Sequence, residues 1–453
     1  MKIKFLGAAK TVTGSKYLVT VDTNRYLIDC GLFQGNHDLR RRNWNPLPVN
    51  PKEIDSVLLT HAHIDHSGYL PLLVKNGFKG KIYATEASYE LCKILLPDSA
   101  HLQEEEATFA NKYHLSKHSP ALPLYNVVEA YKTLNHFKVI PFAQDIVLNK
   151  HVHVTWHPAG HILGAAFLEL RLHGQRIIFS GDLGRDNDPI MYPPKLPPNN
   201  IDYLIIESTY GNREHKKIDP QTELSKIIND TIANEGVIVI PAFAVGRIQS
   251  VLYYLYMLKN SKQIPDIPIY LDSPMGIYST NLLCHFTHEH RLSPDICQNI
   301  ANMVIYTPTP DESKEINRSK GSKIIISAGG MVNGGRVLHH IKYYAPDAKN
   351  AILLTGFQAP GTRGQIIESG HGNTKIFNEV IPVRAKIHSI SNMSAHVDYI
   401  EMLHWLSHTN QAPKKTFITH GESFAAEALK RTIESKLNWN CIIPDYLDEY
   451  EIK

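Results

Sequence analysis

Short apolar runs separated by polar turns dominate roughly the first 200 residues of the chain. The runs are rich in β-branched and aromatic residues and are short, which is typical of strands. We expect strands at 26–29, 56–59, 81–84, 152–156, 166–172, 176–180 and 203–206. Apolar residues at helical spacing predict helices over 67–76, 86–96 and about 100–115. This part of the chain should therefore form a mixed sheet with helices packed outside it.

The pattern of apolar positions changes after about residue 207. Helix-like segments at 222–234, 246–260 and 335–344 alternate with compact apolar runs at 237–240, 267–271, 323–326 and 351–354. Alternation of strands and helices predicts a largely parallel sheet. Because the chain has 453 residues, too many for one ordinary core, we expect two or three domains.

Composition narrows the class of protein. Hydrophobic residues make up 43% and charged residues 20% of the chain, and no apolar run approaches the ~20 residues that a membrane span needs. The uncharged run near the amino terminus is too short for a signal peptide. The five cysteines include no C-x-x-C pair, which argues against a disulfide framework and a thiolate zinc site. These features predict a cytoplasmic protein with no membrane span.

Charge does not single out a nucleic-acid binder, because the formal net charge is only +3. Any basic surface must therefore be local. The clearest basic cluster is Arg40–Arg42, which is followed by Trp44; Lys216–Lys217 and Lys414–Lys415 are smaller. Short charge runs are common on surfaces, so we interpret these as solvated faces rather than phosphate grooves.

The strongest chemical signal is the segment His61-Ala62-His63-Ile64-Asp65-His66, which follows a buried-strand pattern. Imidazole and carboxylate groups are the usual zinc ligands besides cysteine. His61 and His63, two residues apart at an extended strand end, would point the same way, whereas Asp65 and His66 would face elsewhere. This arrangement favours two neighbouring metals over one closed tetrahedron, and a dinuclear site indicates hydrolysis.

Further strand ends supply candidate ligands next to glycine, which permits a close approach of the backbone. They are Pro158-Ala159-Gly160-His161, Ser180-Gly181-Asp182 and Thr419-His420-Gly421, and Asp29 lies in Ile28-Asp29-Cys30-Gly31. In this order the set resembles the metallo-β-lactamase superfamily. The resemblance implies an α/β fold, a four-layer αβ/βα sandwich with metals at the sheet edges.

Motifs in the second half of the chain resemble the β-CASP branch of that superfamily, whose members are nucleic-acid nucleases. The motifs are Glu207–Gly211, Pro241–Arg247, Ser273–Gly276, Ser327–Met331 and Ser394–Asp398. The resemblance is strongest to the pre-mRNA 3′-end-processing endonuclease and its stand-alone bacterial relatives. It implies a metallo-β-lactamase domain at 1–207 and 384–453, interrupted by an inserted β-CASP α/β domain at 208–383.

The resemblance also implies the roles of individual residues. One zinc would be held by His61, His63 and His161, the other by Asp65, His66 and His420, with Asp182 bridging them. Asp29 would orient a ligand by a hydrogen bond. The catalytic residues would be Asp65, Glu207 and His396, with His396 as the general acid. Expected contacts to phosphate are Arg247, Gly329, Gly330, Arg336, Ser391 and Ser394.

The expected activity is that of a zinc-dependent ribonuclease, which hydrolyses phosphodiester bonds in single-stranded regions of RNA with a metal-activated hydroxide. Two Zn²⁺ per chain are expected, although Mn²⁺ or Fe²⁺ would accept the same ligands. Endonucleolytic cleavage is favoured; a 5′→3′ exonuclease and a homodimer stay open. A DNA-processing β-CASP nuclease is the nearest alternative, but such proteins typically carry an apolar residue in place of His420. The inserted domain argues against a small-ester metallo-hydrolase, and the complete ligand set argues against a non-catalytic scaffold.

Overall fold

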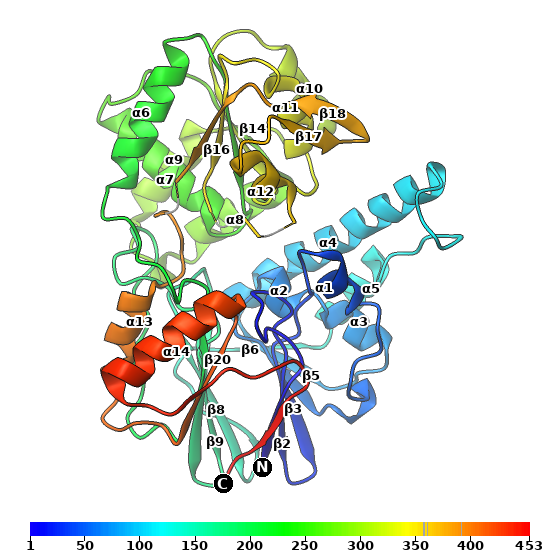
Figure 1. The fold of residues 1–453 in the computed structure, drawn as a ribbon, viewed down its shortest axis with the longest axis vertical. Helices are drawn as coiled ribbons and strands as arrows, with labels where there is room; N and C mark the ends of the chain where they lie inside the picture. The colour runs from blue at the N-terminus through cyan, green and yellow to red at the C-terminus, as the bar shows by residue number, and fades with distance from the viewer. Residues whose placement is uncertain (357, 360, 391) are drawn as a thin grey trace. The chain divides into compact units, whose positions relative to one another are not determined.

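The computed structural model describes residues 1–356, 358–359, 361–390 and 392–453. The chain forms two compact units, one of Met1–Glu214 with His396–Lys453 and one of His215–Ala395 (Figure 1). The second unit is thus an insertion into the first. It ends later than the sequence predicts, because strand β19 (Lys386–Ser389) pairs in parallel with β16 (Ala351–Leu354) of the second unit.

The first unit contains two seven-stranded sheets. The first sheet has the order β22 (Glu449–Glu451), β1 (Lys2–Phe5), β2 (Tyr17–Val21), β3 (Asn24–Ile28), β4 (Ser56–Leu58), β5 (Lys81–Thr85) and β6 (Phe137–Ile140). The second has the order β21 (Cys441–Ile442), β20 (Lys415–Thr419), β11 (Tyr203–Glu207), β10 (Gln175–Phe179), β9 (Ala166–Leu172), β8 (Val152–Pro158) and β7 (Ile146–Asn149).

One apolar core joins these two sheets face to face. Phe5 and Tyr17 from the first sheet pack with Phe179 and Phe417 from the second. Helix α4 (Glu86–Lys112) contacts β5 and β6, and α14 (Ser423–Leu437) contacts β20 and β21, so helices cover the outer faces (Figure 1). The layers are therefore helix, sheet, sheet and helix, and the expected four-layer sandwich is confirmed.

The other helices of the first unit are α1 (His37–Arg41), α2 (Ile64–Ser67), α3 (Leu70–Lys75), α5 (Val127–Leu134) and α13 (Tyr399–Leu406). Helix α4 differs from expectation, because it runs unbroken for 27 residues through Pro97, where two helices were predicted. Proline removes one backbone hydrogen bond from a helix. Here Leu91, Leu95, Leu96 and Ala100 are all buried on either side of Pro97, and this packing outweighs the lost bond.

The second unit is built on the parallel sheet that the sequence predicts. Every described strand pair in this six-stranded sheet is parallel. Its order is β14 (Ile305–Tyr306), β13 (Ile269–Asp272), β15 (Ile324–Ala328), β12 (Ile238–Ala242), β16 and β19, and a separate hairpin is formed by β17 (Asn373–Ile376) and β18 (Glu379–Pro382). The helices are α6 (Pro220–Ile232), α7 (Arg247–Asn260), α8 (Pro274–His285), α9 (Pro294–Met303), α10 (Pro310–Arg318), α11 (Val337–Tyr344) and α12 (Arg363–Glu368).

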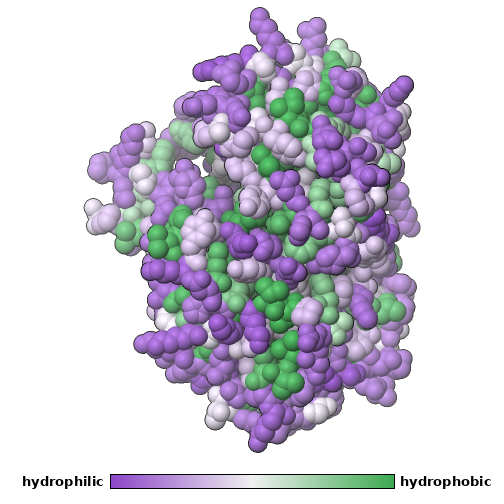
Figure 2. Space-filling view, turned by 180° about the vertical axis from the view of Figure 1, so that it is seen from behind, coloured by the Kyte–Doolittle hydropathy of each residue, from purple (hydrophilic) through white to green (hydrophobic). Residues whose placement is uncertain are grey.

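Polar residues cover most of the face shown in Figure 2, and apolar residues gather there in small patches. Among the described residues, no helix is both long and apolar enough to cross a membrane.

A buried carboxylate ties together several elements of the second unit. Asp272, at the end of β13, is fully buried and accepts hydrogen bonds from Ser313 (2.6 Å), Thr307 (3.0 Å), Arg336 (2.8 Å) and His340 (2.7 Å). Burial alone would raise the pKa of Asp272, but these partners lower it below its ordinary value. The charge of Asp272 therefore stabilises the unit at neutral pH, and this contribution is lost as the pH falls through the lowered pKa.

Replacing Asp272 by asparagine should lower the free energy of unfolding of the second unit by about 2–4 kcal/mol, because the partly exposed Arg336 and the buried His340 lose a charged acceptor. Urea unfolding, followed by hydrogen exchange of amides in β13 and α11, measures this loss. The matched control is Asp266→Asn, since Asp266 is exposed and pairs with Lys259 at the surface. A loss no larger than that of the control would contradict the structural role of Asp272.

Candidate metal and catalytic site

The His61–His66 segment changes from strand to helix within a few residues, and this change sets the directions of its side chains. Strand β4 ends at Leu58, His63 has φ −53° and ψ 147°, outside the helical region, and α2 begins at Ile64. His61 and His63 therefore lie before the helix, whereas Asp65 and His66 lie in its single turn. The two pairs point in different directions, and each can join a different group of ligands.

One group of ligands is formed by His61, His63, His161 and Asp182. His63 Nδ1 lies 3.2 Å from His61 Nε2 and 3.3 Å from His161 Nε2. Asp182 Oδ2 lies 3.4 Å from His61 Nε2 and 3.6 Å from His161 Nε2. Ligands at about 2.0–2.1 Å from a tetrahedral zinc are separated by about 3.3 Å, so these four atoms have the spacing that a zinc ion requires.

A second group is formed by Asp65, His66 and His420, again next to Asp182. His66 Nε2 lies 3.2 Å from His420 Nε2 and 3.3 Å from Asp182 Oδ1. Asp65 Oδ2 lies 3.4 Å from His420 Nε2. Asp182 Oδ1 is buried and accepts no hydrogen bond from the described residues. Asp182 thus offers one oxygen to each group, and a cation would satisfy the buried oxygen that lacks a donor.

The protonation states of the first group suit metal binding. Burial lowers the pKa of His61 to about 3 and also lowers the pKa values of His63 and His161, so their imidazoles are neutral. Burial alone would raise the pKa of Asp182, but the surrounding histidines, led by His420 and His66, hold it well below the ordinary value. Neutral imidazoles and ionised carboxylates are the forms that bind metals. In the second group, burial alone would lower the pKa of His66, but the charges of Asp182 and Asp29 raise it well above its ordinary value, so a metal ion would have to displace a proton from this ring.

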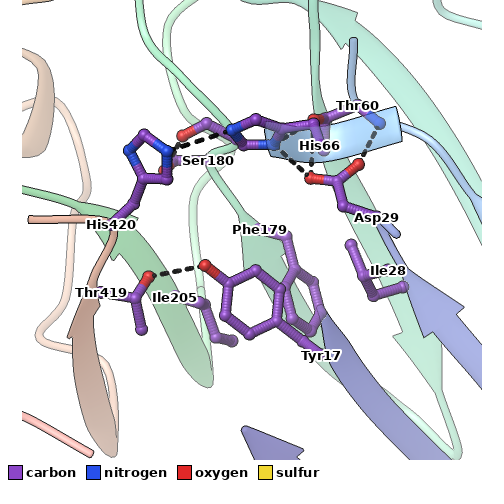
Figure 3. A pocket seen from close by; sticks show the side chains of 11 residues that line it. Tyr17, Ile28, Asp29, Thr60, His66, Phe179, Ser180, Ile205, Thr419 and His420 are labelled. Carbon is purple, nitrogen blue, oxygen red and sulfur yellow. Dashed lines mark hydrogen bonds and ion pairs between the residues drawn. The ribbon is translucent and has the colours of Figure 1, made fainter. Parts of the chain in front are cut away.

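Asp29 makes the contact that was expected of a residue orienting a ligand (Figure 3). Its carboxylate accepts hydrogen bonds from Thr60 N at 2.7 Å and Thr60 Oγ1 at 2.8 Å. It also lies 2.8 Å from His66 Nδ1. An imidazole that donates through Nδ1 presents an unprotonated Nε2, which here points toward the second ligand group.

Three threonines next to the ligands were not predicted from the sequence. Thr60 connects Asp29 to the turn His61–His66, which we call the metal turn, and Thr209 Oγ1 lies 3.2 Å from His420 Nδ1. Thr419, which precedes His420, accepts a hydrogen bond from Tyr17 at 3.1 Å (Figure 3). Their only sequence signal is adjacency to a ligand or a motif, and this is too common to identify a functional threonine.

His396 and Glu207 come together although 189 positions separate them in the sequence. His396 Nδ1 lies 3.1 Å from Glu207 Oε2, and His396 Nε2 lies 4.0 Å from Asp182 Oδ2. Glu207, at the end of β11, is itself held by the backbone N–H of Leu183 at 2.7 Å. Burial lowers the pKa of His396, but the charges of Glu207 and Asp182 outweigh burial and raise this pKa to about 9. The ring is therefore protonated at neutral pH, and its Nε2 lies on the side of Asp182.

The residues expected to contact phosphate have varied surroundings. Arg247 opens α7, and Gly329 and Gly330 follow β15, so all three lie at the carboxyl end of the parallel sheet in the second unit. Arg336 has a different role from the one expected. Its guanidinium donates to Asp272 and to the carbonyl groups of Thr307 and Pro308, at 2.7–2.8 Å. These bonds hold the start of α11 and direct the side chain into the unit.

The other two residues expected to contact phosphate are Ser391 and Ser394. Ser394 is buried. Ser391 lies outside the described residues.

Comparisons with known proteins agree with this architecture. A solved structure of a protein of unknown function from Enterococcus faecalis V583 matches 99% of both chains with a TM-score of 0.53 and 14% sequence identity, which shows similarity of fold alone. Three family models match successive parts of the sequence. They are the metallo-β-lactamase superfamily at residues 11–223, the Beta-Casp domain at 248–367 and the Zn-dependent metallo-hydrolase RNA specificity domain at 380–444.

Relatives match nearly the whole chain. A ribonuclease of Thermus thermophilus is 34% identical over 442 residues, 96% of each chain. An RNase J-like protein of Methanocaldococcus jannaschii is 30% identical over 448 residues, 98% of this chain and 97% of the relative. The transcription termination factor FttA of Methanosarcina mazei is 28% identical over 96% of this chain and 69% of its own. The chain therefore belongs to the β-CASP family of metallo-β-lactamase-fold hydrolases.

Proposed function

We propose that the chain is a ribonuclease that binds two zinc ions and hydrolyses the bond between phosphorus and the 3′-oxygen in single-stranded RNA. The observation that carries the proposal is the position of Asp182, whose two oxygens face two separate groups of ligands. The match to an RNA specificity domain and the relatives named as ribonucleases support RNA as the substrate. The cysteines are free thiols, which supports a reducing cytoplasmic location.

Metal ions bound by the two ligand groups supply an activated water and positive charge for the non-bridging phosphate oxygens. The residues of the chain provide the geometry. Asp182 fixes the spacing of the two groups, and Asp29 fixes the orientation of His66. All the ligands except His63 and Asp65 are almost fully buried. Side chains held by burial and hydrogen bonds need little rearrangement when the substrate binds.

Besides an activated water, the reaction needs a proton donor for its leaving group, and we assign this role to His396. The leaving 3′-oxygen is strongly basic and needs a proton as its bond to phosphorus breaks. His396 offers that proton from Nε2, while Glu207 accepts from Nδ1 and stabilises the protonated ring. The products are a 5′-phosphate and a 3′-hydroxyl.

His420 favours the RNA-processing members of the family over the DNA-processing members. His420 contributes Nε2 to the second ligand group, at 3.2 Å from His66 Nε2, so this group has its full set of side chains. An internal mode of cleavage is proposed, as for the endonucleases that the motifs resemble.

Matched single-stranded RNA and DNA, each labelled at either end, test the proposal. The zinc-loaded wild type should cut RNA internally and leave 5′-phosphate ends, and Asp65→Ala or a chelator should abolish cutting. DNA cut as readily as RNA would overturn the RNA assignment. Failure to cut either nucleic acid, together with hydrolysis of a small ester, would overturn the assignment as a nuclease.

A further inference from the structure

Residues Gln34–Trp44 of the first unit form a loop that contains α1 and exposes an unusual set of side chains. We call it the arginine–tryptophan loop. Arg40 and Arg41 are exposed, Arg42 is half-buried, and the Trp44 side chain is 60% exposed. No residue of α1 is buried. A large exposed aromatic group beside several cations is a common feature of surfaces that bind nucleic acids.

Arg40 and Arg41 of this loop are available for a ligand, whereas Arg42 stacks on aromatic rings. Within the described parts of the chain, the guanidinium groups of Arg40, Arg41 and Arg42 make no hydrogen bond or ion pair. Some arginines elsewhere in the same unit are paired: Arg171 lies 2.6 Å from Asp145, and Arg176 lies 2.9 Å from Glu169. Arg40 acts on Glu106 of α4: burial raises the pKa of Glu106, and the charge of Arg40 partly lowers it.

The loop is closed by a pair of hydrogen bonds at its base. Asn43 is buried, accepts from the backbone N–H of Phe33 at 2.9 Å and donates to its carbonyl at 2.8 Å. Arg42 stacks on Tyr446, with 4.2 Å between its guanidinium carbon and the ring centroid. These contacts fix Asn43 and Arg42, so the backbone that carries Trp44 is held at its base before a ligand binds.

The base of the loop is joined directly to the metal turn. Leu32 N donates to Ile64 O at 2.9 Å, and Cys30 N donates to His66 O at 2.7 Å. Trp44 follows Asn43, which is hydrogen-bonded to Phe33, and Phe33 follows Leu32, which is hydrogen-bonded to Ile64 of α2. These two peptide bonds and two hydrogen bonds span at most about 20 Å. A few nucleotides of extended RNA can cover such a distance.

We propose that the arginine–tryptophan loop, which the sequence pattern alone favoured as a solvated face, binds single-stranded RNA within about 20 Å of the metal turn, and this inference rests on the proposed ribonuclease function. Arg40 and Arg41 contact backbone phosphates, and Trp44 stacks on a base. The combination favours RNA over an acidic protein segment, because an exposed indole offers a stacking surface that bases use and carboxylates do not.

The test measures kcat/KM of the zinc-loaded, full-length protein for RNA at several salt concentrations. Arg40→Gln, Arg41→Gln and Trp44→Ala are each expected to lower kcat/KM by about tenfold, mainly through KM. Each arginine variant should also make the slope of log kcat/KM against log salt shallower by about 0.7. Lys150→Gln is the control. Exposed Lys150 lies in the turn that precedes β8, whereas His161 follows the other end of this strand.

A small diester, bis(p-nitrophenyl) phosphate, separates RNA binding from the metal site. Its hydrolysis should change by less than about twofold in the loop variants, since it is too small to reach the loop from the metal ligands. Unchanged RNA cleavage and salt slope would overturn the inference. An equal loss on the diester, or a change of oligomeric state by light scattering with unchanged RNA affinity, would also overturn it.

Fluorescence anisotropy with the same RNA keeps this test separate from that of the proposed function. A wild type that binds RNA without cleaving it would count against the proposed function alone. Weaker binding by the arginine variants would still support the loop, and unchanged binding would still overturn it.

Discussion

Replacement of Asp182 by alanine is expected to lower RNA cleavage by about 10³-fold or more and to reduce the bound zinc from two ions to at most one. The effect should be large because Asp182 is buried and faces both ligand groups, with Oδ2 toward His61 and His161 and Oδ1 toward His66. Single-turnover cleavage and zinc content, measured by mass spectrometry on the same preparation, provide the readouts.

Asp186→Ala is the matched control for this variant, because Asp186 lies four residues further along the chain and its carboxylate is about half exposed. The control should keep both its metal and its activity. An Asp182→Ala protein with two bound zinc ions and wild-type cleavage would show that Asp182 does not join the two groups.

Replacement of His396 by alanine is expected to slow RNA cleavage by about 10²–10⁴-fold while the zinc content stays near two. His396 lies beside the ligands, but its Nδ1 contacts Glu207 and its Nε2 remains 4.0 Å from Asp182 Oδ2. Loss of the ring should therefore remove a proton donor and spare metal binding. Glu207→Gln should have a smaller effect in the same direction, because His396 would remain while losing its charged partner.

The leaving group distinguishes a proton donor from a residue that only supports the site. A substrate that releases p-nitrophenolate needs little protonation, so His396→Ala should slow its hydrolysis far less than that of RNA. Equal losses on both substrates would exclude His396 as the general acid. Loss of zinc in this variant would reassign His396 to the metal ligands.

The sequence predicted those parts of the fold and the site that a few neighbouring residues determine. His61, His63, Asp65 and His66 lie within one strand-to-helix turn, so their types and spacing already indicate two directions of binding. The parallel sheet of the second unit was predictable for the same reason, because strand and helix periods alternate along the chain.

Features that depend on distant partners could not be predicted from the sequence. Arg336 follows a glycine-rich turn, which is typical of a phosphate ligand, but its partner Asp272 lies 64 positions away. Helix α4 continues through Pro97 because buried neighbours outweigh a local helix breaker. The end of the second unit was placed too early, because the pairing of β19 with β16 is a tertiary contact.

The most direct test of the metal centre is an anomalous difference map, recorded at the zinc absorption edge, from crystals of the zinc-loaded protein. We expect two peaks: one among His61, His63 and His161, and one among Asp65, His66 and His420, with one oxygen of Asp182 bound to each. A single peak, or two peaks that do not share Asp182, would contradict the proposed two-metal site.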